Sequence, residues 1–229
     1  MRHPMLLMRP MLLLAVASSL LTACASHKPS PQSTLTYHAP AQAYSINLGS
    51  QAFRGNVTLR DSCTSLGSTL DITDSLGRFF RVEVINLLNN PNIQIPEFSD
   101  ENTIQELVLN DYLSRVHKSA KLVEQRPVRS RLGSSLYAVL EINAFQKTEF
   151  VGYVVTRRGN FAYVSQHIQN NYRVTDMRDV LAVLTSEIKI PSMTPPSFPR
   201  ERTDLPLFID LKNSTIEQIT EWQKVSHCT

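Results

Sequence analysis

Hydrophobic and polar residues alternate along several short segments in the first half of the chain. The alternation is clearest over residues 44–48, where Tyr, Ile and Leu are separated by Ser and Asn. A period of two is typical of a strand with one buried face. The same pattern predicts strands near residues 57–59, 69–73 and 80–84, and the turn residues 74–77 predict a hairpin between the last two.

Two later segments carry apolar residues at helical spacing. In the first, Ser99 or Asp100 is expected to cap a helix whose apolar positions run from Ile104 to Val116. In the second, Thr175 is expected to cap a helix that continues until Pro191 stops it. Each pattern indicates a helix with one buried face.

The segment between these helices again predicts strands, one near Leu122 and one over 136–142. The next two, 150–156 and 161–168, flank Arg157-Arg158-Gly159-Asn160, a sequence suited to a tight hairpin. Antiparallel hairpins with two amphipathic helices predict an α+β domain in which the helices cover an antiparallel sheet. This order of elements resembles the Mog1/PsbP-like fold, whose members mostly bind other molecules or support assemblies.

The first 23 residues follow the order of a bacterial secretion signal. Arg2 and Arg9 precede an apolar run over 11–21, and small residues follow it. The run is shorter than the roughly 20 residues that span a bilayer, which favours a cleaved signal over a permanent membrane helix.

Leu21-Thr22-Ala23-Cys24 resembles the bacterial lipobox. The resemblance implies that Cys24 receives a diacylglycerol, that the signal is cut before it, and that the new amine is acylated, with palmitate as the expected chain. Two or three acyl chains would hold the protein at a membrane almost irreversibly. Ala25 and Ser26 are not the Asp that retains such proteins at the inner membrane, so we expect the periplasmic face of the outer membrane. The alternative is an ordinary signal peptide with an incidental Cys24.

Composition separates a domain at 44–190 from the segments around it. Residues 24–43 are polar and contain prolines, so they predict a lipidated flexible tether. Residues 191–229 begin with a Pro-rich arm, which we expect to run extended over the surface. Ser214 begins a capping box that predicts a short last helix. This C-terminal helix either packs back on the domain or serves as a partner-binding arm.

The net charge argues against nucleic-acid partners. The chain has 23 Lys+Arg and 20 Asp+Glu, a formal charge of +3. Removal of Arg2 and Arg9 with the signal leaves +1, too weak a field for nonspecific binding to nucleic acid.

Sequence signatures of catalysis, cofactor binding or metal binding are not found. The chain has no Gly-x-Ser-x-Gly, His-Glu-x-x-His or Cys-x-x-Cys motif and no phosphate-binding glycine-rich loop. A triad assembled from distant residues would place His117 or His167 in a cleft. We instead expect a protein that is not an enzyme and that has no cofactor and no metal.

Cys63 and Cys228 remain once Cys24 is lipidated. An even pair of cysteines in an oxidising compartment favours a disulfide, which would tie the C-terminal tail to the strand region. In the chain-entropy model, such a long loop stabilises the fold by roughly 4 to 5 kcal/mol. Free thiols and intermolecular bridges are the alternatives.

Positive charge is concentrated between residues 115 and 131, a segment that contains six Lys or Arg residues and one Glu. Such a surface suits anionic lipid or an acidic protein partner, whereas a solvated helix end and edge strand is the simpler account. The candidate partner surface comprises Arg126, Arg129, Arg131, Arg157, Arg158 and Trp222.

These features favour a lipoprotein with a non-enzymatic binding or scaffold role, as a subunit of an envelope assembly such as a secretion system. Its expected partners are the membrane, through the lipid, and proteins of the envelope. The alternative is a periplasmic lipoprotein that carries a small ligand or lipid in an apolar cavity. An enzyme is the third and weakest hypothesis.

Overall fold

The computed structural model describes residues 35–115, 120–144, 147–170 and 174–191, together with the backbone of 203–209. The chain divides into two compact units, Met1–Gln32 and Ser33–Thr229. The first unit lies outside the described residues, so every element described here belongs to the second.

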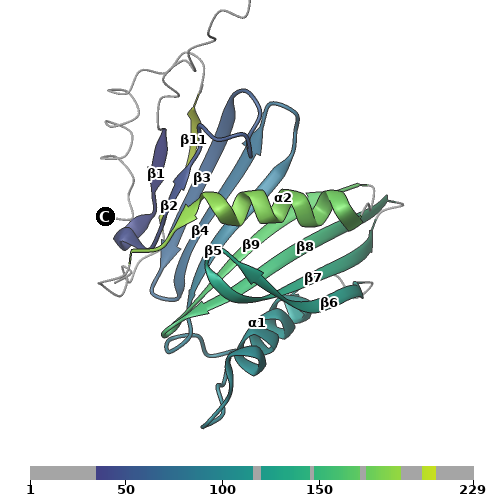
Figure 1. The fold of residues 1–229 in the computed structure, drawn as a ribbon. Coiled ribbons are helices and arrows are strands. Elements are labelled where there is room, and N and C mark those ends of the chain that lie inside the picture. The colour runs from purple at the N-terminus through teal and green to yellow at the C-terminus, as the bar shows by residue number, and fades with distance from the viewer. Residues whose placement is uncertain (1–34, 116–119, 145–146, 171–173, 192–202, 210–229) are drawn as a thin grey trace, which may run out of the picture. The chain divides into compact units, whose positions relative to one another are not determined.

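The main sheet of the described residues has eight antiparallel strands in the order β11-β3-β4-β5-β9-β8-β7-β6 (Figure 1). Its strands β4 and β5, and likewise β8 and β9, form the two predicted hairpins. The α+β prediction of an antiparallel sheet covered by helices is confirmed. In chain order the strands are β3 (Val57–Thr64), β4 (Gly67–Asp74), β5 (Phe79–Asn86), β6 (Lys121–Ser130), β7 (Gly133–Ala144), β8 (Lys147–Arg158), β9 (Phe161–Gln169) and β11 (Thr203–Ile209).

Strand β11 comes from the segment that was expected to run extended over the surface. It pairs with β3 along its whole length and forms one edge of the sheet. An edge strand tolerates Pro206 because its outer N–H groups have no ladder partner to lose. The helix predicted from Ser214 lies outside the described residues.

A smaller sheet joins β1 (Thr36–His38), β2 (Ser45–Asn47) and β10 (Ile188–Lys189), with the 3-10 turn η1 (Pro40–Gln42) between the first two strands. The prediction of a flexible tether over 24–43 is therefore wrong at its C-terminal end. Leu35, Tyr37 and Ala39 are buried, because their spacing of two already belongs to the strand pattern that continues at 44.

Helix α1 (Glu101–Arg115) begins as predicted, since Asp100 Oδ1 accepts the Thr103 N–H at 2.7 Å. Helix α2 (Val174–Glu187) begins before Thr175, so this residue lies in the first turn and does not cap the helix. The helix also ends earlier than predicted. Ile188 pairs with Ile46 in the small sheet, and this pairing outweighs the helical spacing of the sequence. No helix in the described ranges is long and apolar enough to cross a membrane.

Two hydrophobic cores lie on opposite faces of the main sheet. Tyr137 and Val139 of β7 belong to the core that contains α2, whereas Leu136 and Ala138 belong to the core that contains α1. Successive strand residues point to opposite faces, so the two helices cover different faces of the sheet. The small sheet joins α2 on its face, because Tyr37 and Ile46 belong to the same core.

Candidate functional site

On the face that carries α1, strands β3 to β5 present polar side chains that the helix leaves uncovered. The core under α1 includes residues of β5, β7, β8 and β9 but none of β3 or β4. Directly paired residues of neighbouring strands share a face, as Arg60, Asp71 and Arg81 do. We define the polar face as Thr58, Arg60, Ser62, Thr69, Asp71, Thr73, Arg81 and Glu83, which are all half-buried or exposed.

Two arginines on and beside the polar face are fixed in the same way. Arg81 binds Asp71 through two bonds, Nε–Oδ1 at 2.6 Å and Nη2–Oδ2 at 2.9 Å, and its guanidinium lies 5.6 Å from the centroid of the Phe79 ring. Arg115, in the last turn of α1, donates to Asp111 Oδ2 at 2.7 Å and covers the Tyr112 ring at 4.6 Å. A carboxylate on one edge and an aromatic ring on one face hold each guanidinium in a defined orientation.

Glu83 lies between these two arginines and accepts a hydrogen bond from the Tyr112 hydroxyl through Oε2. Burial raises the pKa of Glu83, although the Tyr112 hydrogen bond and the charges of Arg115 and Arg81 act in the opposite direction. Burial also raises the pKa of Tyr112, so the phenol stays protonated and remains the donor. Burial outweighs these favourable interactions, so the charged form of Glu83 is disfavoured.

A pocket of about 180 Å³ opens beside Glu83, between the β3–β4 hairpin, the segment after β5 and the C-terminal turn of α1. Nine of the fourteen described residues that line it have polar side chains. If its ionisable groups are all charged, two carboxylates and one guanidinium give it a net charge of about −1. The lining residues with hydroxyl, amide or charged side chains are Ser62, Thr64, Ser68, Thr69, Glu83, Asn90, Asn92, Asp111 and Arg115.

The arrangement suits recognition through hydrogen bonds and charge. Its carboxylates and hydroxyls accept hydrogen bonds from donors, while Arg115 keeps a side chain that is 49% exposed and presents N–H donors to solvent. The described part of the chain holds no group of three or more His, Cys, Asp or Glu arranged for a metal ion.

No protein-family model matches the chain, and no curated protein matches it. The chain is similar to a crystal structure of a protein from Bacteroides thetaiotaomicron VPI-5482, with 13% identity and a TM-score of 0.40 over 69% of this chain. It spans about half of that protein, namely 48%. It is also similar to the solution structure of cyanobacterial PsbP (CyanoP) from Synechocystis sp. PCC 6803, with 7% identity and a TM-score of 0.44, over 68% of this chain and 91% of that one. Structures with a PsbP-like fold are thus among its neighbours, but similarities this distant say nothing about function.

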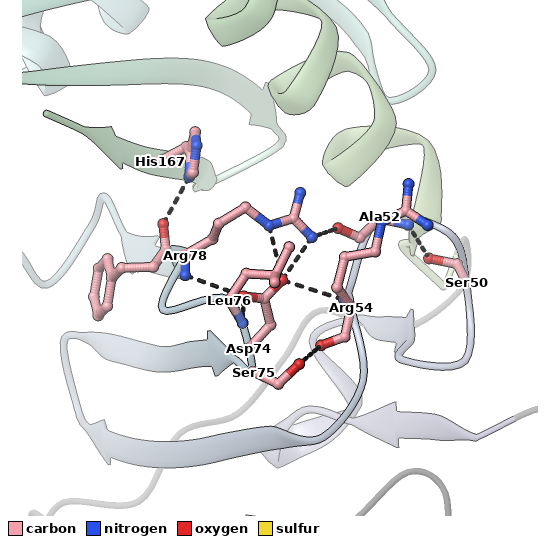
Figure 2. A network of polar contacts seen from close by, with 9 residues as sticks. Ser50, Ala52, Arg54, Asp74, Ser75, Leu76, Arg78 and His167 are labelled. Carbon is pink, nitrogen blue, oxygen red and sulfur yellow. Dashed lines mark hydrogen bonds and ion pairs between the residues drawn. The ribbon is translucent and has the colours of Figure 1, made fainter. Parts of the chain in front are cut away.

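A second polar network centres on Asp74 and fastens the β4–β5 turn to the loop that precedes β3 (Figure 2). Asp74 Oδ1 accepts the N–H groups of Leu76 and Arg78, and Oδ2 accepts the Arg54 N–H together with Nε and Nη2 of Arg78. Arg78 also donates to the Ala52 carbonyl at 2.9 Å. The Asp74 carboxylate is fully buried and bound on both oxygens. We therefore assign this network a structural role, in which it holds the turn and the loop together.

His167, one of the two histidines considered for catalysis, belongs to the core. It is 2% exposed, its ring stacks on Phe80 with centroids 4.7 Å apart, and Nδ1 lies 2.8 Å from the Phe79 carbonyl oxygen. Burial lowers the pKa of His167, so the neutral ring donates to that carbonyl. It does not line the polar pocket. His117 lies outside the described residues.

The structure separates the arginines that the sequence grouped together. Arg126 is half-buried, pairs with Glu124 at 3.0 Å and lies over the Tyr137 ring. The other four, Arg129, Arg131, Arg157 and Arg158, lie at the end of the sheet where the β6–β7 and β8–β9 turns occur. Trp222 lies outside the described residues.

The cysteine predictions fall largely on residues that the structure does not describe. Cys63 lies in β3, is 1% exposed and is not a free thiol. Cys228, the expected partner, and Cys24, the expected lipid carrier, lie outside the described residues. The disulfide and the lipid anchor therefore stay predictions.

Sequence reasoning missed the polar face and its pocket. The residues that form it come from β3, β4, β5 and α1, and only pairing of the strands brings them together. One signal was available, because Arg81 and Glu83 are the polar positions of an otherwise apolar alternation. A second was the spacing of Asp111 and Arg115, which are four residues apart on one helix.

Proposed function

We propose that this chain is a lipoprotein anchored through Cys24 at the periplasmic face of the outer membrane, and that its domain binds an envelope protein through the polar face without catalysing a reaction. In this proposal the protein is a subunit of an envelope assembly, such as a secretion system. The lipobox-like sequence supports the anchor, and the geometry of the polar face supports the binding.

The observation that carries the binding role is the fixed orientation of Arg81 and Arg115. Arg and Tyr are enriched among the residues that dominate protein interfaces. Arginines that are already held by Asp71 and Asp111 lose little conformational entropy when a partner binds. A preorganised polar face beside a pocket is therefore well suited to receive a protein surface.

The charge of the pocket indicates what the partner presents to it. The carboxylates of Glu83 and Asp111 outnumber the one guanidinium of Arg115 in the lining. A Lys or Arg side chain of the partner would compensate Glu83, whose charge is disfavoured by burial. We infer that the partner inserts a basic side chain at this point.

Carriage of lipid or another apolar ligand has weaker support. The side chains of both cores are at most 8% exposed, and each core packs a helix directly on the sheet. The pocket described above includes Glu83, Asp111 and Arg115 in its lining and lies at the surface of the sheet. These features support recognition at a surface.

Site-specific photo-crosslinking in the native envelope tests the binding role. A photoreactive phenylalanine analogue at Thr73, on the polar face, should crosslink one envelope protein, whereas the same group at Val183, exposed on α2, should not. Glu83→Gln should reduce the Thr73 crosslink at least about fivefold, because it removes the charge that a basic side chain would meet. Equal yields from Thr73 and Val183, or a Thr73 yield unchanged by Glu83→Gln, would count against the proposal.

Fractionation of a Cys24→Ser variant tests the anchor separately. The variant should remain unprocessed or leave the outer membrane, because no diacylglycerol can be attached. A processed protein that still fractionates with the outer membrane would show that another feature holds it there.

A further inference from the structure

Four segments meet at one end of the main sheet. They are the β3–β4 turn, the segment that follows β5, the β8–β9 turn and the β6–β7 turn. Asn86 N–H, at the end of β5, donates to the Leu66 carbonyl, and Leu87 N–H donates to the Asn160 carbonyl. The end of β5 and the segment after it therefore contact the turns on both sides. A Cβ built on Gly133 would lie 3.9 Å from Cζ of Arg158, so the β6–β7 turn adjoins the β8–β9 turn.

Within the described residues, the arginines at this end have no carboxylate partner. Arg131 Nη1 donates to the Ser186 carbonyl at 3.2 Å, and Arg157 Nε donates to the Gly159 carbonyl at 2.9 Å. Carbonyl acceptors orient a guanidinium without cancelling its charge. The ion pairs of the described residues involve Arg78, Arg81, Arg115 and Arg126 and none of the arginines at this end. The turn residues 65–66, 87–89, 129–133 and 157–160 include no Asp or Glu.

Exposed leucines lie on the same row of turns. Leu88, in the segment after β5, is 72% exposed, and Leu66, in the β3–β4 turn, is 40% exposed. A single exposed leucine needs no explanation, but two of them on the same row of turns as four arginines without a carboxylate partner form a specific combination. It is the combination that a bilayer surface accommodates, because arginines bind lipid phosphates while leucines enter the boundary between headgroups and acyl chains.

We propose that this end of the sheet, with Arg129, Arg131, Arg157, Arg158, Leu66 and Leu88, docks on an anionic phospholipid surface. An acidic protein would satisfy the arginines but would leave the leucines unexplained. The lipid anchor of the proposed function would keep the domain near such a surface, and in this respect the inference rests on that function. Docking would fix the orientation of the domain relative to the membrane.

Leu88→Trp and Leu76→Trp form a matched pair of probes. Leu76 is 69% exposed, nearly as much as Leu88, but it lies in the β4–β5 turn at the opposite end of the same sheet. The full-length lipidated protein is reconstituted in phosphatidylcholine vesicles with brominated acyl chains, with or without about 30% phosphatidylglycerol. Quenching is measured against the wild type, which contributes Trp222 to every sample.

With phosphatidylglycerol present, the bromines should quench Leu88→Trp but not Leu76→Trp. Adding Arg131→Gln and Arg158→Gln to Leu88→Trp should reduce the quenching at least about fivefold, since each arginine near an anionic surface contributes about one such factor. The control substitutions Arg54→Gln and Arg178→Gln remove the same charge from exposed residues elsewhere and should have no effect.

Equal quenching of the two tryptophan probes would overturn the docking surface. Quenching that neither needs phosphatidylglycerol nor responds to the arginines would overturn it as well. If Arg131→Gln and Arg158→Gln abolish a crosslink to an acidic protein and Leu88→Trp is not quenched, the surface binds protein instead. Partition of the wild type into Triton X-114 reports on the anchor alone, so failure of the anchor is distinguishable from failure of docking.

Discussion

Removal of the Asp74 carboxylate should be far more costly than removal of Asp71, although both bind an arginine through two nitrogens. The Asp74 side chain is 0% exposed and accepts five hydrogen bonds, whereas Asp71 is 21% exposed and its partner Arg81 is 35% exposed. Asp74→Ala would leave the guanidinium of Arg78 and three backbone N–H groups without their acceptor. The comparison isolates the effect of burial on one type of ion pair.

The exposed fractions of the paired side chains set the expected losses in free energy of unfolding. Breaking a buried ion pair by removing one partner costs about 3 to 5 kcal/mol. Arg78 is 27% exposed, so water can partly replace Asp74, and we expect a loss near the lower end, about 3 kcal/mol. Asp71→Ala should cost at most about 1 kcal/mol, because water screens that pair. Asp74→Asn keeps an acceptor for the N–H groups of Leu76 and Arg78 and should cost about 2 kcal/mol, since it loses chiefly the charged bonds.

Urea unfolding of the full-length proteins, followed by circular dichroism, measures these differences in the free energy of unfolding. A similar slope with denaturant for all variants would show that the same structure unfolds in each. If Asp74→Ala lowers the free energy of unfolding no more than Asp71→Ala does, burial does not strengthen the ion pair of Asp74 and Arg78. The explanation given for the stability of the β4–β5 turn would then be wrong.

Three further predictions concern the core and the tail. Gly152→Ala should destabilise the protein by about 1 to 3 kcal/mol, because the new Cβ would lie 2.5 Å from Sδ of Met177. Urea unfolding measures this change, and an unchanged free energy of unfolding would show that α2 shifts freely. Burial lowers the pKa of His167, so wild-type stability should fall as pH drops below the ordinary histidine value of 6.5; His167→Phe should lack this fall, and parallel pH profiles would refute the assignment. Cys228→Ser should expose one titratable thiol at Cys63 in denaturant and lower stability by about 4 kcal/mol, whereas two reactive thiols in unreduced wild type would exclude the disulfide.

The sequence by itself determined most of the local structure. The alternation over 69–84 and around Gly159 predicted both hairpins, and Asp100 marked the start of α1, because period, turn residues and caps are properties of neighbouring residues. It failed where a distant partner decided the outcome. Ile188 has helical spacing but pairs with Ile46 in the small sheet. Tyr37 lies in a segment whose prolines predicted a tether, but it is buried in the core that contains α2.

The tertiary structure alone decided which polar residues come together. Arg81, Glu83 and Asp111 are ordinary surface residues in the sequence, and they form one site only because α1 leaves β3 and β4 uncovered. In the same way, Leu87 contacts Asn160 of the β8–β9 turn only because β5 pairs with β9. Strand order and the face that a helix covers depend on contacts between residues far apart in the chain, which no local pattern encodes.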